Sequence, residues 1–166
     1  MNQPNQPVQT KRAKRKRFTK VAALFVSLAG AIGVGSACVS MPSDIGLQEG
    51  RLRPCPSSPN CVCSEGEDPS IAPLTYTGNG QAAFQSLIEL IEAQPRVELV
   101  TVEQTYAHAV FRTPLMRFRD DLEVRLDEPN TVIHVRSASR VGHSDMGANR
   151  KRVEALRVLW AQPSKD

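Results

Sequence analysis

The chain has 166 residues, a length that accommodates one folded domain with additional segments. Its formal net charge is +4, but residues 1–20 contain seven Lys or Arg side chains and no acidic one. The remaining residues carry 14 basic and 17 acidic side chains, a net charge of about −3, so the basic character belongs to the N-terminus. A nucleic-acid-binding domain needs a basic face of its own, and this charge distribution argues against one.

An apolar segment without any charge, Val21–Val39, follows the basic residues. A basic start, an apolar centre and small residues after it are typical of a secretory signal. For the basic residues alone, a nuclear-localisation or RNA-binding arm is the alternative. We predict that residues 1–37 are a leader segment whose basic end stays cytoplasmic, so that the folded part is exported.

The small residues Gly35, Ser36 and Ala37 precede Cys38, an arrangement that resembles a lipoprotein signal. We predict lipidation of Cys38 and a lipid anchor in the cell membrane or outer membrane, facing the periplasm. Gly35 stands where such signals usually have a branched aliphatic residue, and two alternatives stay open. Cleavage after Ala37 gives a free exported protein. Without cleavage the segment becomes a signal anchor, because its 19 uncharged residues can just span a bilayer.

The three other cysteines follow the apolar segment, which fits an oxidising compartment. Cys55 and Cys61 bracket a short loop of Pro, Ser and Asn and are the predicted disulfide, although the sequence leaves the pairing open. Cys63 then has no partner. A zinc site is the alternative, but the Cys61-x-Cys63 spacing is not the usual C-x2-C and no paired histidine lies nearby. We predict neither a metal nor a cofactor.

The folded domain is predicted to span residues 54–162, after a tether at residues 38–53. Its first part, residues 54–75, is rich in Pro, Ser and Cys and predicts an ordered loop rather than a helix or a strand. A helix is predicted over residues 81–94, where apolar residues recur at helical spacing. Its cap is Asn79, and its apolar stripe is formed by Phe84, Leu87, Ile88 and Ile91.

Four strands follow at residues 97–103, 106–113, 122–127 and 131–137, with short connections that favour antiparallel neighbours. In the third, charged residues alternate with apolar ones, which predicts a half-buried strand. A closing helix is predicted over residues 146–161. The order α-β-β-β-β-α indicates an α+β fold: a single antiparallel sheet of about four strands, with an N-terminal and a C-terminal helix packed on one face.

Residues 136–152 are Arg-Ser-Ala-Ser-Arg-Val-Gly-His-Ser-Asp-Met-Gly-Ala-Asn-Arg-Lys-Arg. This segment resembles the signature of the DUF1499 family, whose members have no established biochemical function. Two other pieces are similar to the family in the same order, at residues 54–64 and 118–123. The resemblance covers about residues 52–160 and implies an envelope or chloroplast-lumen location, but no reaction. Cys63 stands where a small polar residue is expected, so its role is not transferred.

The signature leaves a strand, turns at Gly142 and enters a helix at Asp145. Helix N-termini and arginines bind anions, so we predict a site here for an anionic small molecule or an envelope-protein partner. The predicted ligand-binding residues are Arg136, Ser139, Arg140, His143, Asp145, Asn149, Arg150 and Arg152. The alternative for the arginines is ion pairing with Asp120, Asp121 and Glu123.

Asn149 falls on one helical line with Val153, Leu156 and Trp160, and should therefore face the core, where an amide needs partners. The interpretation that we favour is that Asn149 and Asp145 tie the turn to the N-terminal loop. Lining a ligand pocket is the alternative.

Three functions are consistent with these features. The favoured one is an exported, membrane-anchored envelope protein that binds without catalysis, and the second is a structural module whose polar signature only holds the fold. The third is a small hydrolase using Asp120, Asp145 and His143 for acid–base chemistry. The sequence contains no nucleophile elbow, phosphate loop or HExxH motif, which weakens the hydrolase hypothesis.

Overall fold

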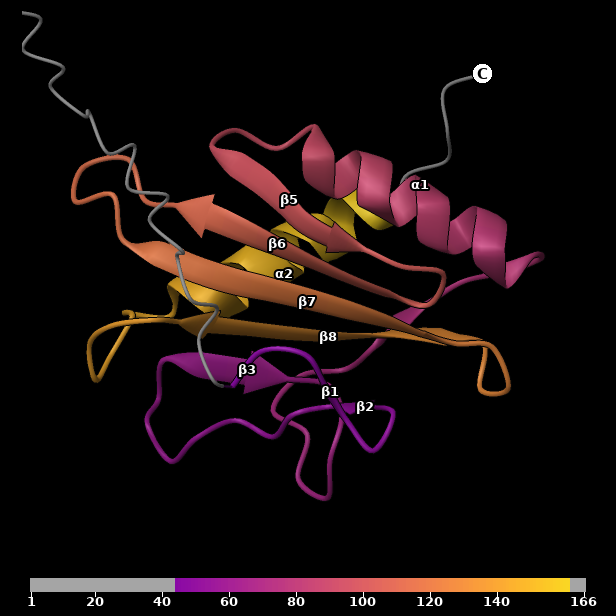
Figure 1. The fold of residues 1–166 in the computed structure, drawn as a ribbon, viewed down its shortest axis with the longest axis horizontal. Coiled ribbons are helices and arrows are strands. Elements are labelled where there is room, and N and C mark those ends of the chain that lie inside the picture. The colour runs from indigo at the N-terminus through magenta and orange to yellow at the C-terminus, as the bar shows by residue number, and fades with distance from the viewer. Residues whose placement is uncertain (1–43, 162–166) are drawn as a thin grey trace, which may run out of the picture. The chain divides into compact units, whose positions relative to one another are not determined.

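The computed structural model describes residues 44–161, so the predicted leader and Cys38 lie outside the described residues. The described part is an α+β domain with two helices and antiparallel strands (Figure 1). In chain order its elements are β1 (Leu47–Gln48), β2 (Arg51–Leu52), β3 (Cys61–Cys63), β4 (Leu74–Thr75), α1 (Gly80–Glu92), β5 (Val97–Val102), β6 (Tyr106–Arg112), β7 (Arg119–Asp127), β8 (Val132–Ser139) and α2 (Ala148–Trp160).

The large sheet has six strands, in the order β3-β8-β7-β6-β5, and β4 pairs with β8 as well. The four predicted strands are β5 to β8, which form hairpins with their neighbours in the chain. Strands β3 and β4 were not predicted, and the expectation of about four strands is wrong. Both lie within residues 54–75, are only two or three residues long and pair with β8, so they leave no periodic pattern in the sequence.

The arrangement of the helices also differs from the prediction, because four short strands precede α1 in the chain. Helix α1 begins as predicted, with Asn79 Oδ1 accepting a hydrogen bond from Ala82 N at 2.9 Å. Helix α2 begins at Ala148, two residues later than expected, because Gly147 is its N-cap with a φ of 77°. This left-handed conformation favours glycine and turns the chain into the helix.

One side of the sheet packs against both helices through a single apolar cluster. Alternate residues of β6, β7 and β8 point into it, as strand geometry requires. Each fully buried aliphatic or aromatic side chain stabilises the fold by roughly 1.5–3 kcal/mol. The residues that α1, α2, β6, β7 and β8 contribute to this apolar cluster are Phe84, Leu87, Ile88, Ile91, Ala107, Ala109, Leu122, Val124, Leu126, Ile133, Val135, Val153 and Leu156.

The other side of the sheet is partly covered by residues Asp44–Leu52, which we call the strap. It contains β1 and β2, which pair with each other. Its backbone N–H at Gly46 donates to Glu123 Oε1 at 2.8 Å, and Leu52 packs with Tyr106 in a small apolar cluster. Residues 44–52 of the predicted tether are thus packed on the domain.

The prediction that β7 is a half-buried strand is wrong, because the strap covers the face that carries its charged residues. Glu123 has an exposed fraction of 0%, and its neighbour on the same face, Asp121, is also buried. The alternation of apolar and charged residues is real, but both faces are covered. None of the described helices has the length and apolar character needed to cross a bilayer.

Candidate functional site

The signature segment, residues 136–152, runs from the middle of β8 through a turn into the first half of α2. Its turn lies at the same end of the sheet as the β6–β7 connection, because Arg140 N donates to the Arg119 carbonyl oxygen at 3.1 Å. The start of β3 joins it there, since Ser139 N donates to the carbonyl oxygen of Asn60 at 3.0 Å.

Asn149 is the centre of this region and is fully buried, as its place on the apolar line of α2 predicts. Its Nδ2 donates to the Asn60 carbonyl oxygen at 2.9 Å, to Asp145 Oδ2 at 2.8 Å and to Ser139 Oγ at 3.0 Å. Its Oδ1 accepts from Ser137 Oγ at 2.7 Å and also from Arg152 Nη1. The amide therefore ties the helix to β8 and to the N-terminal loop, which is the role that the sequence favoured.

Asp145 organises the start of α2 although Gly147 is the formal N-cap. Its Oδ1 accepts from Gly147 N at 2.9 Å, and its Oδ2 accepts from Asn149 N at 2.7 Å. Burial alone would raise the pKa of Asp145, but these hydrogen bonds outweigh it and lower the pKa below its usual value. The carboxylate thus satisfies N–H groups that a free helix N-terminus would offer to an anion.

The four arginines of the signature segment also have partners within the domain. Arg150 donates to the Ser70 carbonyl oxygen at 2.9 Å, and the other three pair with carboxylates. These ion pairs are Arg136 with Glu123 and Asp44, Arg140 with Asp121, and Arg152 with Asp120. The described residues therefore contain the ion pairs that the sequence analysis gave as the alternative to an anion site.

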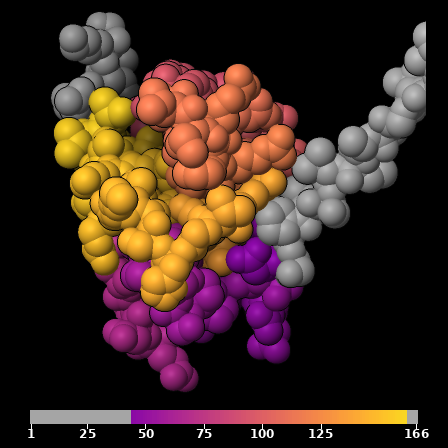
Figure 2. All heavy atoms as spheres, turned by 90° about the vertical axis from the view of Figure 1, so that its left-hand side faces the viewer, coloured from indigo at the N-terminus to yellow at the C-terminus, as the bar shows by residue number. Residues whose placement is uncertain are grey.

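A hollow of about 350 Å³ lies between the signature turn and the β6–β7 connection. Figure 2 faces this end of the domain, where the orange β6–β7 connection adjoins the amber signature turn. Two apolar side chains on its wall are strongly exposed: Phe118 at 47% and Val141 at 57%. Among the polar residues that also line it, Asp120, Ser139 and Asp145 belong to the network around Asn149 or to the ion pair with Arg152.

Residues 51–159 match the family model described as "Protein of unknown function (DUF1499)". The chain belongs to the DUF1499 family. A comparison with curated proteins finds no match.

The three residues of the hydrolase hypothesis are only partly brought together in this DUF1499 domain. Asp120 and Asp145 line the same hollow, whereas His143 is exposed on the turn and is not part of its lining. No hydrogen bond joins any two of the three within the described residues. Asp120 and Asp121 point to opposite faces of β7, as predicted, since Asp120 pairs with Arg152 and Asp121 with Arg140.

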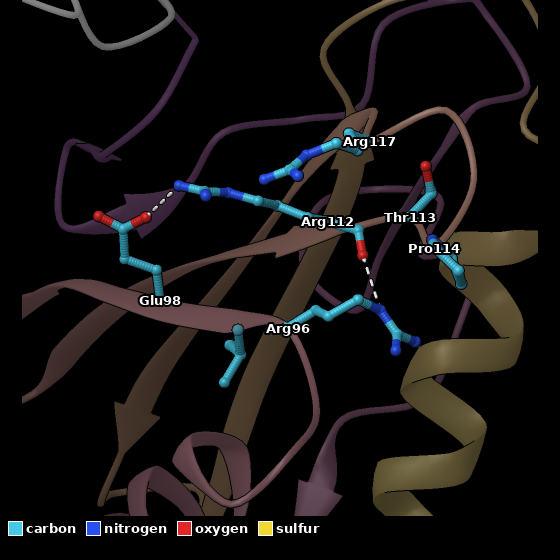
Figure 3. A pocket seen from close by; sticks show the side chains of 7 residues that line it. Arg96, Glu98, Arg112, Thr113, Pro114 and Arg117 are labelled. Atoms are coloured by element: carbon cyan, nitrogen blue, oxygen red, sulfur yellow. Dashed lines mark hydrogen bonds and ion pairs between the residues drawn. The ribbon is translucent and has the colours of Figure 1, made fainter.

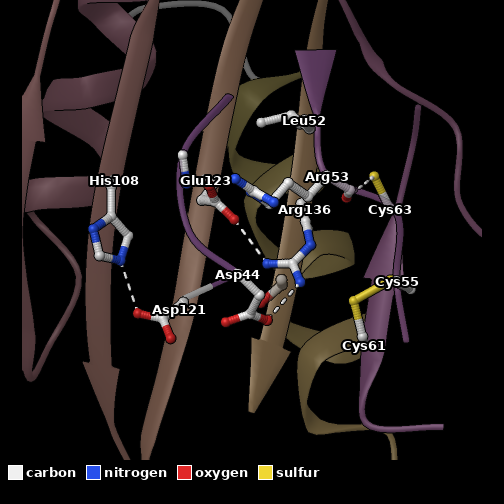
Figure 4. Close-up of polar contacts among 12 residues, drawn as sticks. Asp44, Leu52, Arg53, Cys55, Cys61, Cys63, His108, Asp121, Glu123 and Arg136 are labelled. Carbon is white, nitrogen blue, oxygen red and sulfur yellow. Dashed lines mark hydrogen bonds and ion pairs between the residues drawn. A yellow bond between two sulfur atoms is a disulfide. The ribbon is translucent and has the colours of Figure 1, made fainter. Parts of the chain in front are cut away.

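A second polar cluster, whose burial under the strap sequence reasoning missed, lies on the other side of the DUF1499 sheet (Figure 4). Glu123 accepts from Tyr106 Oη and from Arg136 Nη1, both at 2.8 Å. Arg136 also pairs with Asp44 of the strap at 3.0 Å. Burial, together with the nearby Glu123 charge, raises the pKa of Tyr106, which keeps its hydroxyl a hydrogen-bond donor.

Beside it, His108 Nε2 lies 2.7 Å from Asp121 Oδ1, and Arg140 Nε donates to Asp121 Oδ2 at 2.9 Å. Burial alone would raise the pKa of Asp121, but these two partners lower it below its usual value. The signal that could have revealed the cluster is register: Glu123 and Arg136 are direct cross-strand neighbours on β7 and β8.

The predicted disulfide is present, because Cys55 and Cys61 are bonded. Cys63 is buried and has no disulfide partner among residues 44–161, and burial raises the pKa of its thiol. No cluster of His, Cys, Asp or Glu in the described part of the chain is arranged to hold a metal ion.

Another cavity, of about 280 Å³, lies at the β5 and β6 edge of the sheet (Figure 3). Three arginines line it, Arg96, Arg112 and Arg117, with Glu98 as the acidic residue among them. Arg112 Nη2 donates to Glu98 Oε2 at 2.6 Å, so one of the three charges is neutralised locally.

Proposed function

We propose that this DUF1499 protein is an exported, membrane-anchored and non-catalytic module that binds an envelope-protein partner at the hollow beside the signature turn. The observation that carries the binding part is the contrast between the rim and the floor of the hollow. The rim exposes Phe118 and Val141, whereas the polar groups of the floor are engaged in internal hydrogen bonds. Such a site offers apolar side chains for contact with a partner, held in place by hydrogen bonds, but both of its carboxylates are already bound and are not available for catalysis.

An anionic small molecule is the other partner that the sequence allows. The arginine pairing favours a protein segment instead, because Arg136, Arg140 and Arg152 are already neutralised by carboxylates. Arg150 is the exception, since its partner is a backbone carbonyl. Loss of binding in Arg150→Ala, with Val141 variants still active, would favour the anionic ligand.

The test of the binding site uses two valines with similar exposure. Val141 lies on the hollow at 57%, and Val158 lies on α2 at 62%. In a deletion strain of the host, Val141→Asp should fail to restore the envelope phenotype, whereas Val158→Asp should restore it. Both variants should melt like the parent protein, because neither valine is buried. Equal complementation by both would remove the hollow from the proposal.

Asn149→Ala separates binding from a purely structural role of the signature. Losing a fully buried amide with five side-chain or backbone partners should lower the stability by roughly 1–3 kcal/mol. If activity in the strain follows melting temperature across Asn149→Ala, Val141→Asp and Val158→Asp, the signature only holds the fold.

Export and anchoring rest on residues 1–37 and Cys38, and intact mass spectrometry of protein purified from host membranes tests them. A mature chain that begins at Cys38 and carries acyl mass supports the lipoprotein. An uncleaved chain supports a signal anchor instead, and a chain cleaved after Ala37 without lipid supports a free exported protein. Reduction should add the mass of two hydrogen atoms, because it converts the Cys55–Cys61 disulfide into two thiols.

The hydrolase is a second candidate because Asp120 and Asp145 line one hollow. Its weakness is that Asp145 accepts from Gly147 N and Asn149 N while Asp120 is bound to Arg152. Chromogenic ester and phosphoester substrates test this hydrolase candidate. We expect that no turnover of these substrates depends on Asp120, so Asp120→Asn should behave like the parent protein.

A further inference from the structure

The connection between β6 and β7, residues Arg112–Arg119, is a hairpin with a tightly closed base. Arg112 and Arg119 are cross-strand partners. Thr113 N donates to the Phe118 carbonyl oxygen at 2.9 Å, and Phe118 N donates to Thr113 Oγ1 at 2.9 Å. The tip, residues 114–117, is therefore presented by a fixed base.

This tip exposes large apolar side chains. Leu115 is 91% exposed and Met116 is 67% exposed. Neighbouring exposed apolar residues of this size mark an interaction surface, whereas isolated ones need no explanation.

Arginines flank the apolar tip, and the hairpin contains no acidic residue. Within Arg112–Arg119 the basic residues are Arg112, Arg117 and Arg119. Among the described residues, Arg117 and Arg119 form no side-chain hydrogen bond or ion pair. Figure 3 shows Arg112 and Arg117 reaching into the same space, on the edge where Arg96 also lies. After the Arg112–Glu98 pair, this edge keeps an excess of positive charge.

We propose that the β6–β7 hairpin docks on an anionic lipid bilayer, with Leu115 and Met116 in the interfacial region and Arg117 and Arg119 bound to lipid phosphates. The charge and the shape both match this partner. Apolar side chains at a tip reach toward the acyl chains, while arginines extend their guanidinium groups back to the headgroup layer. An anionic surface attracts each such arginine, and salt weakens that attraction.

The inference goes beyond the proposed function, because it concerns a second point of membrane contact on the folded domain. It does not depend on the leader. A protein held only by its N-terminus leaves the hairpin in water, whereas a docked hairpin fixes which end of the sheet faces the lipid. Failure of the N-terminus to anchor the chain and failure of the hairpin to dock must therefore be measured separately.

The experiment places one tryptophan at the tip of the full-length chain. Trp160 is the single native tryptophan, so Trp160→Phe gives a silent background. Met116→Trp in that background is reconstituted with vesicles of phosphatidylcholine and phosphatidylglycerol at three to one, containing lipids brominated on the acyl chains. Quenching of the tryptophan reports on the hairpin, and co-sedimentation with the vesicles reports on the leader. Val158→Trp in the same background is the control on α2.

We expect quenching at position 116 but not at 158, and little at 116 in vesicles of phosphatidylcholine alone. Adding Arg117→Ala should lower the ratio of docked to undocked hairpin about fivefold, and high salt should act in the same direction. Equal quenching at the two positions, or none at 116 in the anionic vesicles, overturns the proposal even if the chain sediments. A lipid-independent emission shift that grows with protein concentration overturns it too, because the tip then contacts a second copy.

Discussion

The two sides of strands β6 to β8 are built from alternate residues of the same segments, yet one side is apolar and the other is ionic. Leu122 packs under the helices, while Glu123, the next residue, binds Arg136 and Tyr106 under the strap. The helix side is stabilised because apolar surface is removed from water, and this effect does not depend on how charges are placed. The strap side is stable only while each buried charge keeps its partner.

The largest effect is expected for Glu123→Ala. This change removes the acceptor of Gly46 N, Tyr106 Oη and Arg136 Nη1, and leaves the buried Arg136 with the strap alone. We expect a loss of roughly 3–5 kcal/mol in the free energy of unfolding, measured by urea denaturation. The double variant Glu123→Leu with Arg136→Met should recover part of this loss, because no buried charge is then left unpaired. A double variant less stable than Glu123→Ala would contradict this account.

Leu122→Ala is the matched change on the helix side, one residue away on β7. It creates a cavity beneath α1 and α2 and should cost roughly 2–5 kcal/mol. The difference lies in the response to conditions. The stability lost in Leu122→Ala should be the same at low and high pH, because no titrating group has been removed. A pH-dependent loss would show that the two sides are coupled across the sheet.

The same comparison explains what the sequence could predict. Periodicity located β5 to β8 and both helices, because the pattern of Leu122, Val124 and Leu126 is set by local geometry. It did not reveal that the charged side is buried. The alternation looks identical whether the charges face water or a strap, and the strap contacts Glu123 from 77 residues away in the chain.

The candidate site shows the same limit. The helical line of α2 predicted a buried Asn149, and the interpretation that it ties down the N-terminal loop is confirmed by its bond to the Asn60 carbonyl oxygen. That partner lies 89 residues away, so no local pattern identified it. Sequence proximity suggested that the arginines gather around a ligand, whereas their side chains lie on both faces of the sheet and pair there with Asp120, Asp121 and Glu123.

Asp121→Asn gives the third effect, of roughly 1–3 kcal/mol at neutral pH, because it weakens the contacts with His108 and Arg140. The pKa of Asp121 is lowered in the folded protein relative to its ordinary value of 3.8. The stability that its charge contributes is therefore present above about pH 4 and is lost as the pH falls through the lowered folded pKa. Asp121→Asn should accordingly flatten the decline of stability in acid. If the stability of Asp121→Asn declines in acid as steeply as that of the parent protein, the decline is caused by other carboxylates.

The smallest effect is expected for Asp44→Asn, which tests how firmly the strap is held. The Asp44 carboxylate lies 3.0 Å from Arg136 Nη2, but the Asp44 side chain is 55% exposed, so water screens the pair. We expect a loss of about 1 kcal/mol or less, which should shrink further in high salt. Arg136 keeps Glu123 in this variant and is never left unpaired. A loss as large as that of Glu123→Ala would mean that Asp44, rather than Glu123, neutralises Arg136, and that the strap is as much a part of the ionic side as β7 is.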